Sequence, residues 1–117
     1  MHEAGHYAGS WINDHAKAYF GIEQSILDTL PMFTAGCFGL SAYSQTAMTF
    51  LDDWRKSMEA GCFKGDWSNH RHDMVCGSIV AKSLAMDFQF GENYLEYAAP
   101  ETTPKNETII IKLQGVC

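Results

Sequence analysis

The sequence is poor in basic residues and contains no long apolar run. Eight lysines and arginines stand against fourteen aspartates and glutamates, which gives a net charge of −6. Because nucleic-acid binding needs a basic patch for the phosphate backbone, we exclude nucleic acid as a partner. No apolar stretch approaches the roughly 18 residues of a membrane-spanning helix. With no signal peptide evident at the start, we expect a cytoplasmic protein without a transmembrane segment.

Closely spaced cysteine pairs are also missing. The four cysteines, Cys37, Cys62, Cys76 and Cys117, form no C-x-x-C pair. This spacing argues against a structural zinc ribbon and against a thioredoxin-type redox site. Two disulfides are arithmetically possible, but Cys37 and Cys76 lie inside apolar runs, where a free thiol packs as a small hydrophobic group. We therefore favour reduced, buried cysteines over a disulfide framework.

Hydrophobic periodicity predicts an α/β fold. Helices are expected in residues 11–21, 22–30, 44–61 and 72–86, strands in residues 32–40 and 108–116, and a short strand pair in residues 88–100. The two main strands are apolar on both faces, so we expect them to be central in a partly parallel sheet. The length of 117 residues suits a single domain or a domain fragment whose first strands are missing.

Capping residues mark the helix of residues 44–61 most clearly. Ser44 is the expected N-cap and Gly61 the expected C-terminal stop. An apolar stripe of Ala47, Leu51, Trp54 and Met58 is predicted to face the core. Gly21 is expected to end the first helix in the same way.

A literal H-E-x-x-H motif opens the chain at His2-Glu3-Ala4-Gly5-His6. On a helix this spacing places two imidazoles on one face beside a carboxylate, as in zinc hydrolases. The longer metzincin pattern would need a third ligand at position 12, but Ile12 cannot coordinate zinc. A zinc metallohydrolase with His2 and His6 as ligands is therefore kept as an alternative function only.

The loop "FKGDWSNHRHDM" concentrates residues that bind ligands or transfer protons. It contains Trp67, His70, Arg71, His72 and Asp73 directly before an apolar helix. Helix starts favour anions and carboxylates, so Asp73 has a structural interpretation as an N-terminal cap. The cluster as a whole, held between two well-marked helices, favours a ligand site with His70, His72 and Asp73 at its centre.

Residues 31–117 resemble the C-terminal half of GT-A glycosyltransferases related to the glycogenin-type family. The resemblance rests on "TAGCFGLSAYSQTAMTFLDDW", "FKGDWSNHRHDMVCGSIVAKSLAM" and "IIIKLQGV", in this order. It implies that a turn containing Gly36, the loop residue Asp73 and a late segment with Gln114 and Gly115 face a nucleotide-sugar. Arg71 and Trp67 would then contact phosphate and a sugar ring.

Three departures from that family define what the resemblance implies for this chain. Met74 stands where the family has Gln, residues 112–114 supply no histidine ligand, and no D-x-D triplet occurs. The resemblance therefore implies the acceptor-side part of a transferase, inactive alone. Its Mn²⁺ or Mg²⁺ ligands would lie mostly outside this chain, and its partners would be a nucleotide-sugar and an acceptor. A non-catalytic binding module is the second alternative, and the oligomeric state stays open.

Overall fold

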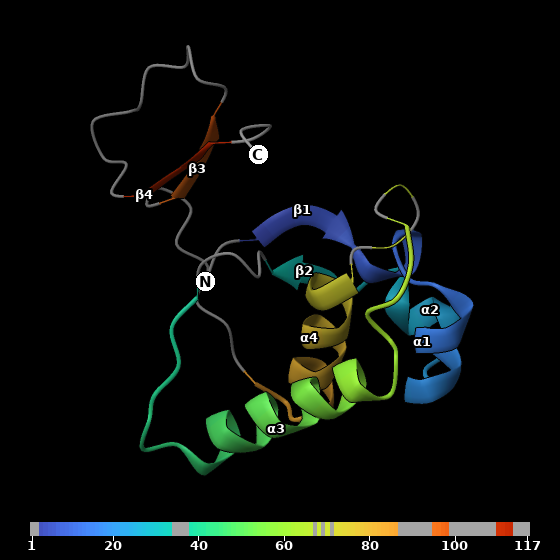
Figure 1. The fold of residues 1–117 in the computed structure, drawn as a ribbon, viewed down its shortest axis with the longest axis horizontal. Helices are drawn as coiled ribbons and strands as arrows, with labels where there is room; N and C mark the ends of the chain where they lie inside the picture. Colours follow the sequence, from blue (N-terminus) through green and yellow to red (C-terminus); the bar gives the residue numbers. More distant parts are fainter. Residues whose placement is uncertain are drawn as a thin grey trace.

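Helix α4, His72–Ser83, is buried along most of its length. The computed structural model describes residues 3–33, 38–66, 68, 70, 72–86, 95–98 and 110–113. In it, α4 lies between a small sheet on one side and the long helix α3, Gln45–Glu59, on the other (Figure 1). Because both sides of α4 are covered, apolar residues surround it instead of forming a single stripe. Its expected extent, 72–86, is confirmed except for the last three residues.

The sheet on α4 is formed by two antiparallel strands. β1, Glu3–Tyr7, pairs with β2, Pro31–Phe33, with an irregularity in register between Glu3 and Tyr7. A second sheet pairs β3, Leu95–Ala98, with β4, Ile110–Leu113, in parallel. The expected mixture of helices and strands is therefore confirmed. A GT-A-like arrangement of these strands stays a prediction.

Two expectations about the strands were wrong. Among the described residues, β2 and β4 each pair with one neighbour in a two-stranded sheet, so neither is the central strand that was expected in residues 32–40 and 108–116. β2 covers residues 31–33, and residues 38–40 are outside any strand. In β2, Met32 and Phe33 are buried, Met32 beside Val75 and Ile79 of α4 and Phe33 beside Trp54 of α3. β3 lies within the expected strand pair of residues 88–100, but its partner is β4.

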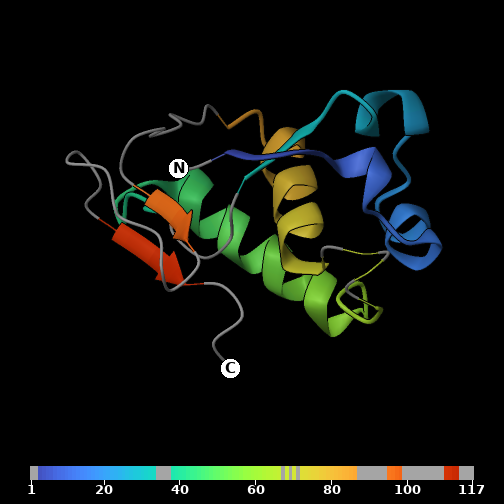
Figure 2. The same cartoon turned by 90° about the horizontal axis from the view of Figure 1, so that it is seen from above.

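Three short helical segments connect β1 to β2. They are η1, Ala8–Ser10, α1, Asp14–Phe20, and α2, Gln24–Leu27. Asn13 caps α1 by accepting a hydrogen bond from the Ala16 backbone N–H at 2.8 Å. Gly21 ends α1 with a φ of 59°, as the sequence predicts, because glycine adopts this left-handed conformation without strain. Figure 2 shows these segments, in blue, to one side of α4.

The ends of α3 are confirmed, but its buried face is rotated from the predicted one. The Ser44 side chain accepts from the Ala47 N–H at 3.2 Å, and Gly61 follows the helix with a φ of 86°. Leu51 and Met58 are 41% and 49% exposed, so they are not core residues. The buried face instead carries Ala47, Phe50 and Ser57, with Trp54 partly buried beside them.

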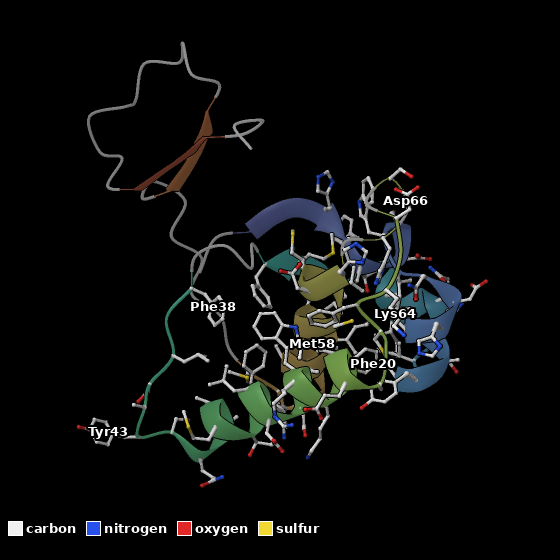
Figure 3. All side chains as sticks on the ribbon, in the orientation of Figure 1. Phe20, Phe38, Tyr43, Met58, Lys64 and Asp66 are labelled. Atoms are coloured by element: carbon white, nitrogen blue, oxygen red, sulfur yellow. The ribbon has the colours of Figure 1, made fainter. Side chains whose placement is uncertain are left out.

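An aromatic cluster joins β2 to α3 next to α4. The ring of Phe33 lies 5.8 Å from Trp54 and 5.6 Å from Phe38, measured between centroids. Phe50 completes the cluster at 5.4 Å from Trp54. These edge and tilted arrangements are the favoured ones for aromatic rings. Figure 3 shows Phe38 directed toward this core and Tyr43 extending away from it.

Gly77 allows the close approach of this cluster to α4. A Cβ atom at Gly77 would lie 2.7 Å from Phe33 Cζ and 2.9 Å from Trp54 Cε2. We expect Gly77→Ala to lower the free energy of unfolding, because overpacking costs about 1–3 kcal/mol. The better helix propensity of alanine returns only about 1 kcal/mol. Urea denaturation measures the difference.

Gly39→Ala is the matched control, since a Cβ there would meet no atom within 4 Å. This control variant should leave the free energy of unfolding within about 0.5 kcal/mol of the wild type. A Gly77→Ala variant as stable as the wild type would show that β2 and α3 do not press on α4 as described.

Candidate functional site

The loop between α3 and α4 is fastened to the chain before α1 by side chains. The Asn13 side-chain amide donates to the Lys64 carbonyl at 2.8 Å, while its oxygen caps α1. His15 Nε2 lies 2.9 Å from the Ala60 carbonyl oxygen. Figure 3 shows Lys64 and Asp66 on this loop, beside the first helical segments. The loop is therefore attached to a separate part of the chain.

His70 makes the most buried of these attachments. Its side chain is 1% exposed. Its Nδ1 lies 2.9 Å from the Trp11 carbonyl oxygen, and its Nε2 lies 2.8 Å from the Cys62 carbonyl oxygen. Both ring nitrogens thus contact the backbone, so His70 is placed to hold the loop and not to meet a ligand.

His72 packs against His70 at the start of α4. The two ring centroids are 4.8 Å apart, with an angle of 86° between the ring planes. His72 is 9% exposed. Burial lowers its pKa, and the neighbouring His70 lowers it further, although Asp73 and Asp66 act in the opposite direction. The imidazole of His72 is therefore neutral at neutral pH, able to donate one hydrogen bond and accept another.

Asp73 follows in the first turn of α4 and is half-buried. Its Oδ1 accepts a hydrogen bond from the Met74 backbone N–H at 2.9 Å. A carboxylate has two oxygens with about four acceptor positions, so this bond uses only part of its capacity. Of the predicted central residues, Asp73 has the most accessible acceptor group.

Trp54 connects this helix start to the end of β2. Its indole Nε1 donates to the Asp73 carbonyl oxygen at 3.0 Å. The same indole contacts Phe33, the last residue of β2. Residues 34–36, which contain the predicted Gly36 turn, follow Phe33 directly in the chain. The structure thus brings the chain immediately before that turn close to Asp73.

The other predicted site residues lie outside the described residues. These are Trp67, Arg71, Gly36, Gln114 and Gly115, together with His2 of the zinc motif. His6 lies in β1, exposed, with its ring 5.4 Å from that of Trp11. In a strand, residues four apart are separated by about 13 Å, whereas a helix rise brings them to about 6 Å.

The zinc motif therefore has a different backbone from the one its spacing suggests. Glu3, Ala4, Gly5 and His6 are extended in β1, although the hydrolase arrangement needs a helix. Within the part of the chain that the structure describes, no three His, Cys, Asp or Glu side chains gather to hold a metal ion.

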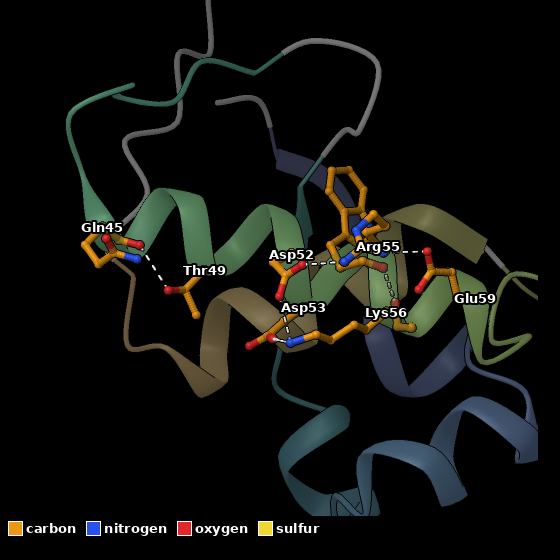
Figure 4. Close-up of polar contacts among 9 residues, drawn as sticks. Gln45, Thr49, Asp52, Asp53, Arg55, Lys56 and Glu59 are labelled. Carbon is orange, nitrogen blue, oxygen red and sulfur yellow. Dashed lines mark hydrogen bonds and ion pairs between the residues drawn. The ribbon is translucent and has the colours of Figure 1, made fainter.

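Adjacent carboxylates on α3 are bound by cations of the same helix. Asp52 pairs with Arg55 and Lys56, Asp53 pairs with Lys56, and Glu59 pairs with Arg55 (Figure 4). Hydrogen bonds from Lys56 and then Arg55 lower the pKa of Asp52. Such exposed pairs add little stability, and they occupy the oxygens that a divalent cation would need. We therefore do not assign a metal site to Asp52 and Asp53.

Two of the four cysteines lie within the described residues, and both are free and buried, as the sequence predicts. Burial raises the pKa of Cys76 to about 12, with the nearby Cys62 adding to this effect. Burial also raises the pKa of Cys62. Since the thiolate is the reactive form, neither side chain is a catalytic nucleophile at neutral pH.

An open cleft of about 480 Å³ between α1, α3 and α4 was not foreseen from the sequence. It is lined by Tyr19, Phe20, Gly21, Ile22, Asp53, Ile79, Val80 and Ser83. None of the predicted site residues is among them. The role of Asn13 was not predicted either, although a residue of this type before a predicted helix is a typical capping residue.

Comparison of the chain with protein-family models, with curated proteins and with solved structures gives no match. Among the helices that the structure describes, none has the length and apolar character needed to span a membrane.

The lowered pKa of His72 gives a pH-dependent stability. Because the pKa of His72 is lower in the folded state, the unfolded chain binds a proton at this side chain more readily. The stability that comes from the neutral form is therefore fully present above the pKa of an unfolded histidine and is lost as pH falls. We expect the free energy of unfolding to decrease below about pH 6.5. His72→Gln should remove this part of the decrease in urea titrations from pH 7.5 to 5.

His15→Gln is the control, because His15 is exposed. It should leave the acid limb unchanged. A His72→Gln variant with the same loss of stability between pH 7.5 and 5 as the wild type would contradict the assignment.

Proposed function

We propose that this chain is the acceptor-side part of a nucleotide-sugar glycosyltransferase, with Asp73 and His72 binding sugar hydroxyl groups. The supporting observation is the position of Trp54, which hydrogen-bonds to Asp73 and contacts Phe33 at the end of β2. In the family that the sequence resembles, the turn after such a strand and the start of the second following helix face the same ligand. The contact through Trp54 is consistent with that arrangement.

The chemistry of these two side chains suits a sugar. A hydroxyl group donates to a carboxylate and can both donate to and accept from a neutral imidazole. Burial of His72 favours the neutral form needed for this exchange. Glycosyl transfer also requires the donor sugar to be held in one orientation, with its anomeric carbon toward the acceptor hydroxyl. Asp73 and His72, both on the first turn of a packed helix, provide a rigid support for that orientation.

The proposed role of His70 differs from that of its neighbours. Because both of its ring nitrogens contact backbone carbonyl oxygens, it supports His72 by packing and does not bind the sugar. Trp67 and Arg71 on the loop, with Gly36, Gln114 and Gly115, complete the proposed ligand surface. The Mn²⁺ or Mg²⁺ ion that would neutralise the donor diphosphate finds no set of ligands among the described side chains, so no part of the proposal depends on it.

Binding of nucleotide-sugars tests the proposal. ¹⁵N-labelled chain is titrated with UDP-glucose, UDP-galactose, UDP-N-acetylglucosamine and GDP-mannose, each with and without Mg²⁺. We expect at least one donor to bind with a dissociation constant of about 1 mM. Its binding should shift the resonance of the Trp54 indole N–H group. Asp73→Asn should weaken this binding about tenfold, since a hydrogen bond to a charged group contributes about 1.5–3 kcal/mol.

Asp53→Asn is the matched control, because Asp53 is also a partly exposed carboxylate and lies on α3. It should bind the same donor as tightly as the wild type does. If no donor binds, or if Asp73→Asn binds as tightly as the wild type, the proposal is wrong. If the chain instead binds one equivalent of zinc, and the His6→Ala variant does not, the zinc hydrolase is favoured. If the chain binds neither a nucleotide-sugar nor zinc, the non-catalytic binding module remains.

A further inference from the structure

We propose that the cleft between α1, α3 and α4 binds a small organic cation that carries a primary ammonium group on an aromatic or apolar body. The cleft has a volume of about 480 Å³. Pockets for small molecules have volumes of roughly 300–1,000 Å³, so one such molecule fits. Neither Asp73 nor His72 lines the cleft. The inference is therefore independent of the sugar binding proposed above.

The apolar surface of the cleft is held in place by the core. Ile79 and Val80 of α4 line it and are 2% and 3% exposed. Phe20, the last residue of α1, also lines it and packs against the core clusters that contain these two residues. This surface is therefore formed before a ligand binds, and the apolar body of a ligand would remove it from water.

The end of α1 leaves the cleft open and adds an aromatic ring. Gly21 lines the cleft, and a Cβ atom there would meet no atom within 4 Å. Tyr19 is 46% exposed, and its contact with Phe20, at 5.0 Å between ring centroids, holds the phenol ring beside the cleft. The face of a tyrosine ring attracts a cation within about 6 Å. This ring therefore favours a cationic ligand over an anionic one.

Asp53 gives the cleft a negative charge. It is the only charged residue among the described residues that line the cleft. Its Oδ1 lies 3.3 Å from Lys56 Nζ, but this lysine lies closer to Asp52, with 2.7 Å between Nζ and Oδ2 (Figure 4). A carboxylate has about four acceptor positions, so Asp53 can also accept a hydrogen bond from a ligand.

The ion pairs of α3 that argue against a metal ion permit an amine. A divalent cation such as Mg²⁺ or Ca²⁺ needs about six or more oxygen ligands. An ammonium group needs only a few acceptors, and the acceptor positions left on Asp53 are enough to begin with.

Ser83 adds a second acceptor to the cleft. Its hydroxyl group donates to the Val80 carbonyl oxygen at 2.8 Å, so the hydroxyl oxygen is left to accept a hydrogen bond. Asp53 and Ser83 thus both present acceptors, and an ammonium group carries only donors. A carboxylate or phosphate ligand would instead face a charge of its own sign. The net charge of −6 attracts cations to the chain in the same sense.

Nuclear magnetic resonance titration of the full ¹⁵N-labelled chain tests the proposal. The probes at pH 7 are phenethylammonium, phenethyl alcohol and hydrocinnamate, which share an aromatic body and are positive, neutral and negative. We expect phenethylammonium to bind with a dissociation constant of about 1 mM and to shift the backbone N–H resonances of Ile79, Val80 and Ser83. Phenethyl alcohol should bind about tenfold more weakly, because it lacks the charge-assisted hydrogen bond. Hydrocinnamate should not bind.

Two variants test the charge and the location separately. Asp53→Asn should weaken the binding of phenethylammonium about tenfold and leave that of phenethyl alcohol unchanged. Ser83→Leu should weaken the binding of both probes, since a larger side chain at this exposed position fills part of the cleft. Glu59→Gln is the matched control, because Glu59 is an exposed carboxylate of α3 that pairs with Arg55 and does not line the cleft. It should bind phenethylammonium as the wild type does.

The outcomes are distinct from those of the sugar titration. Equal affinities for phenethylammonium and phenethyl alcohol, or wild-type affinity in Asp53→Asn, would overturn the assignment of a cation. Unchanged binding in Ser83→Leu would place the probe outside the cleft and overturn the proposal as well. Because Asp53→Asn should still bind a nucleotide-sugar as the wild type does, failure of one ligand rejects only the proposal that names it.

Discussion

The close contact between Phe33 and Gly77 is the constraint on which the other contacts of this structure depend. A glycine at this point of α4 lets the end of β2 and the indole of Trp54 approach the helix backbone. The Phe33 backbone N–H then donates to the Ser78 hydroxyl at 3.2 Å. A larger residue would move β2 and α3 away from α4 together, because both contact it at this position.

Trp54 connects this packing to the start of α4. Its indole packs in the aromatic cluster with Phe33 and Phe50, and its N–H group donates a hydrogen bond to the Asp73 carbonyl oxygen. A buried indole needs a hydrogen-bond partner, so the position of the cluster and the position of the first turn of α4 are fixed by one side chain. The core therefore places the candidate ligand residues directly.

The two histidines next to this turn have opposite environments although they touch. Both ring nitrogens of His70 lie at hydrogen-bond distance from backbone carbonyl oxygens, those of Trp11 and Cys62. His72 is desolvated and faces that ring, so its pKa is lowered. Two residues apart in the sequence, they are indistinguishable by composition or motif. Their difference comes entirely from the atoms that the fold puts around each ring.

The sequence determined the helices and their ends, because helix capping depends on side chains close to the backbone groups that they bind. Ser44, Gly21 and Gly61 act on backbone groups within a few residues, so capping could be predicted correctly without the fold. Tertiary structure decided the rest, because burial and strand pairing depend on distant residues. Pairing with β2 holds Glu3–Tyr7 as an extended strand, and residues 3–6 of the H-E-x-x-H motif, whose spacing suggested a helix, lie in this strand. Packing against α4 buries Phe50 and leaves Leu51 exposed. The Trp11 carbonyl oxygen, 59 residues away in the sequence, and the Cys62 carbonyl oxygen contact both ring nitrogens of His70 and give it its role.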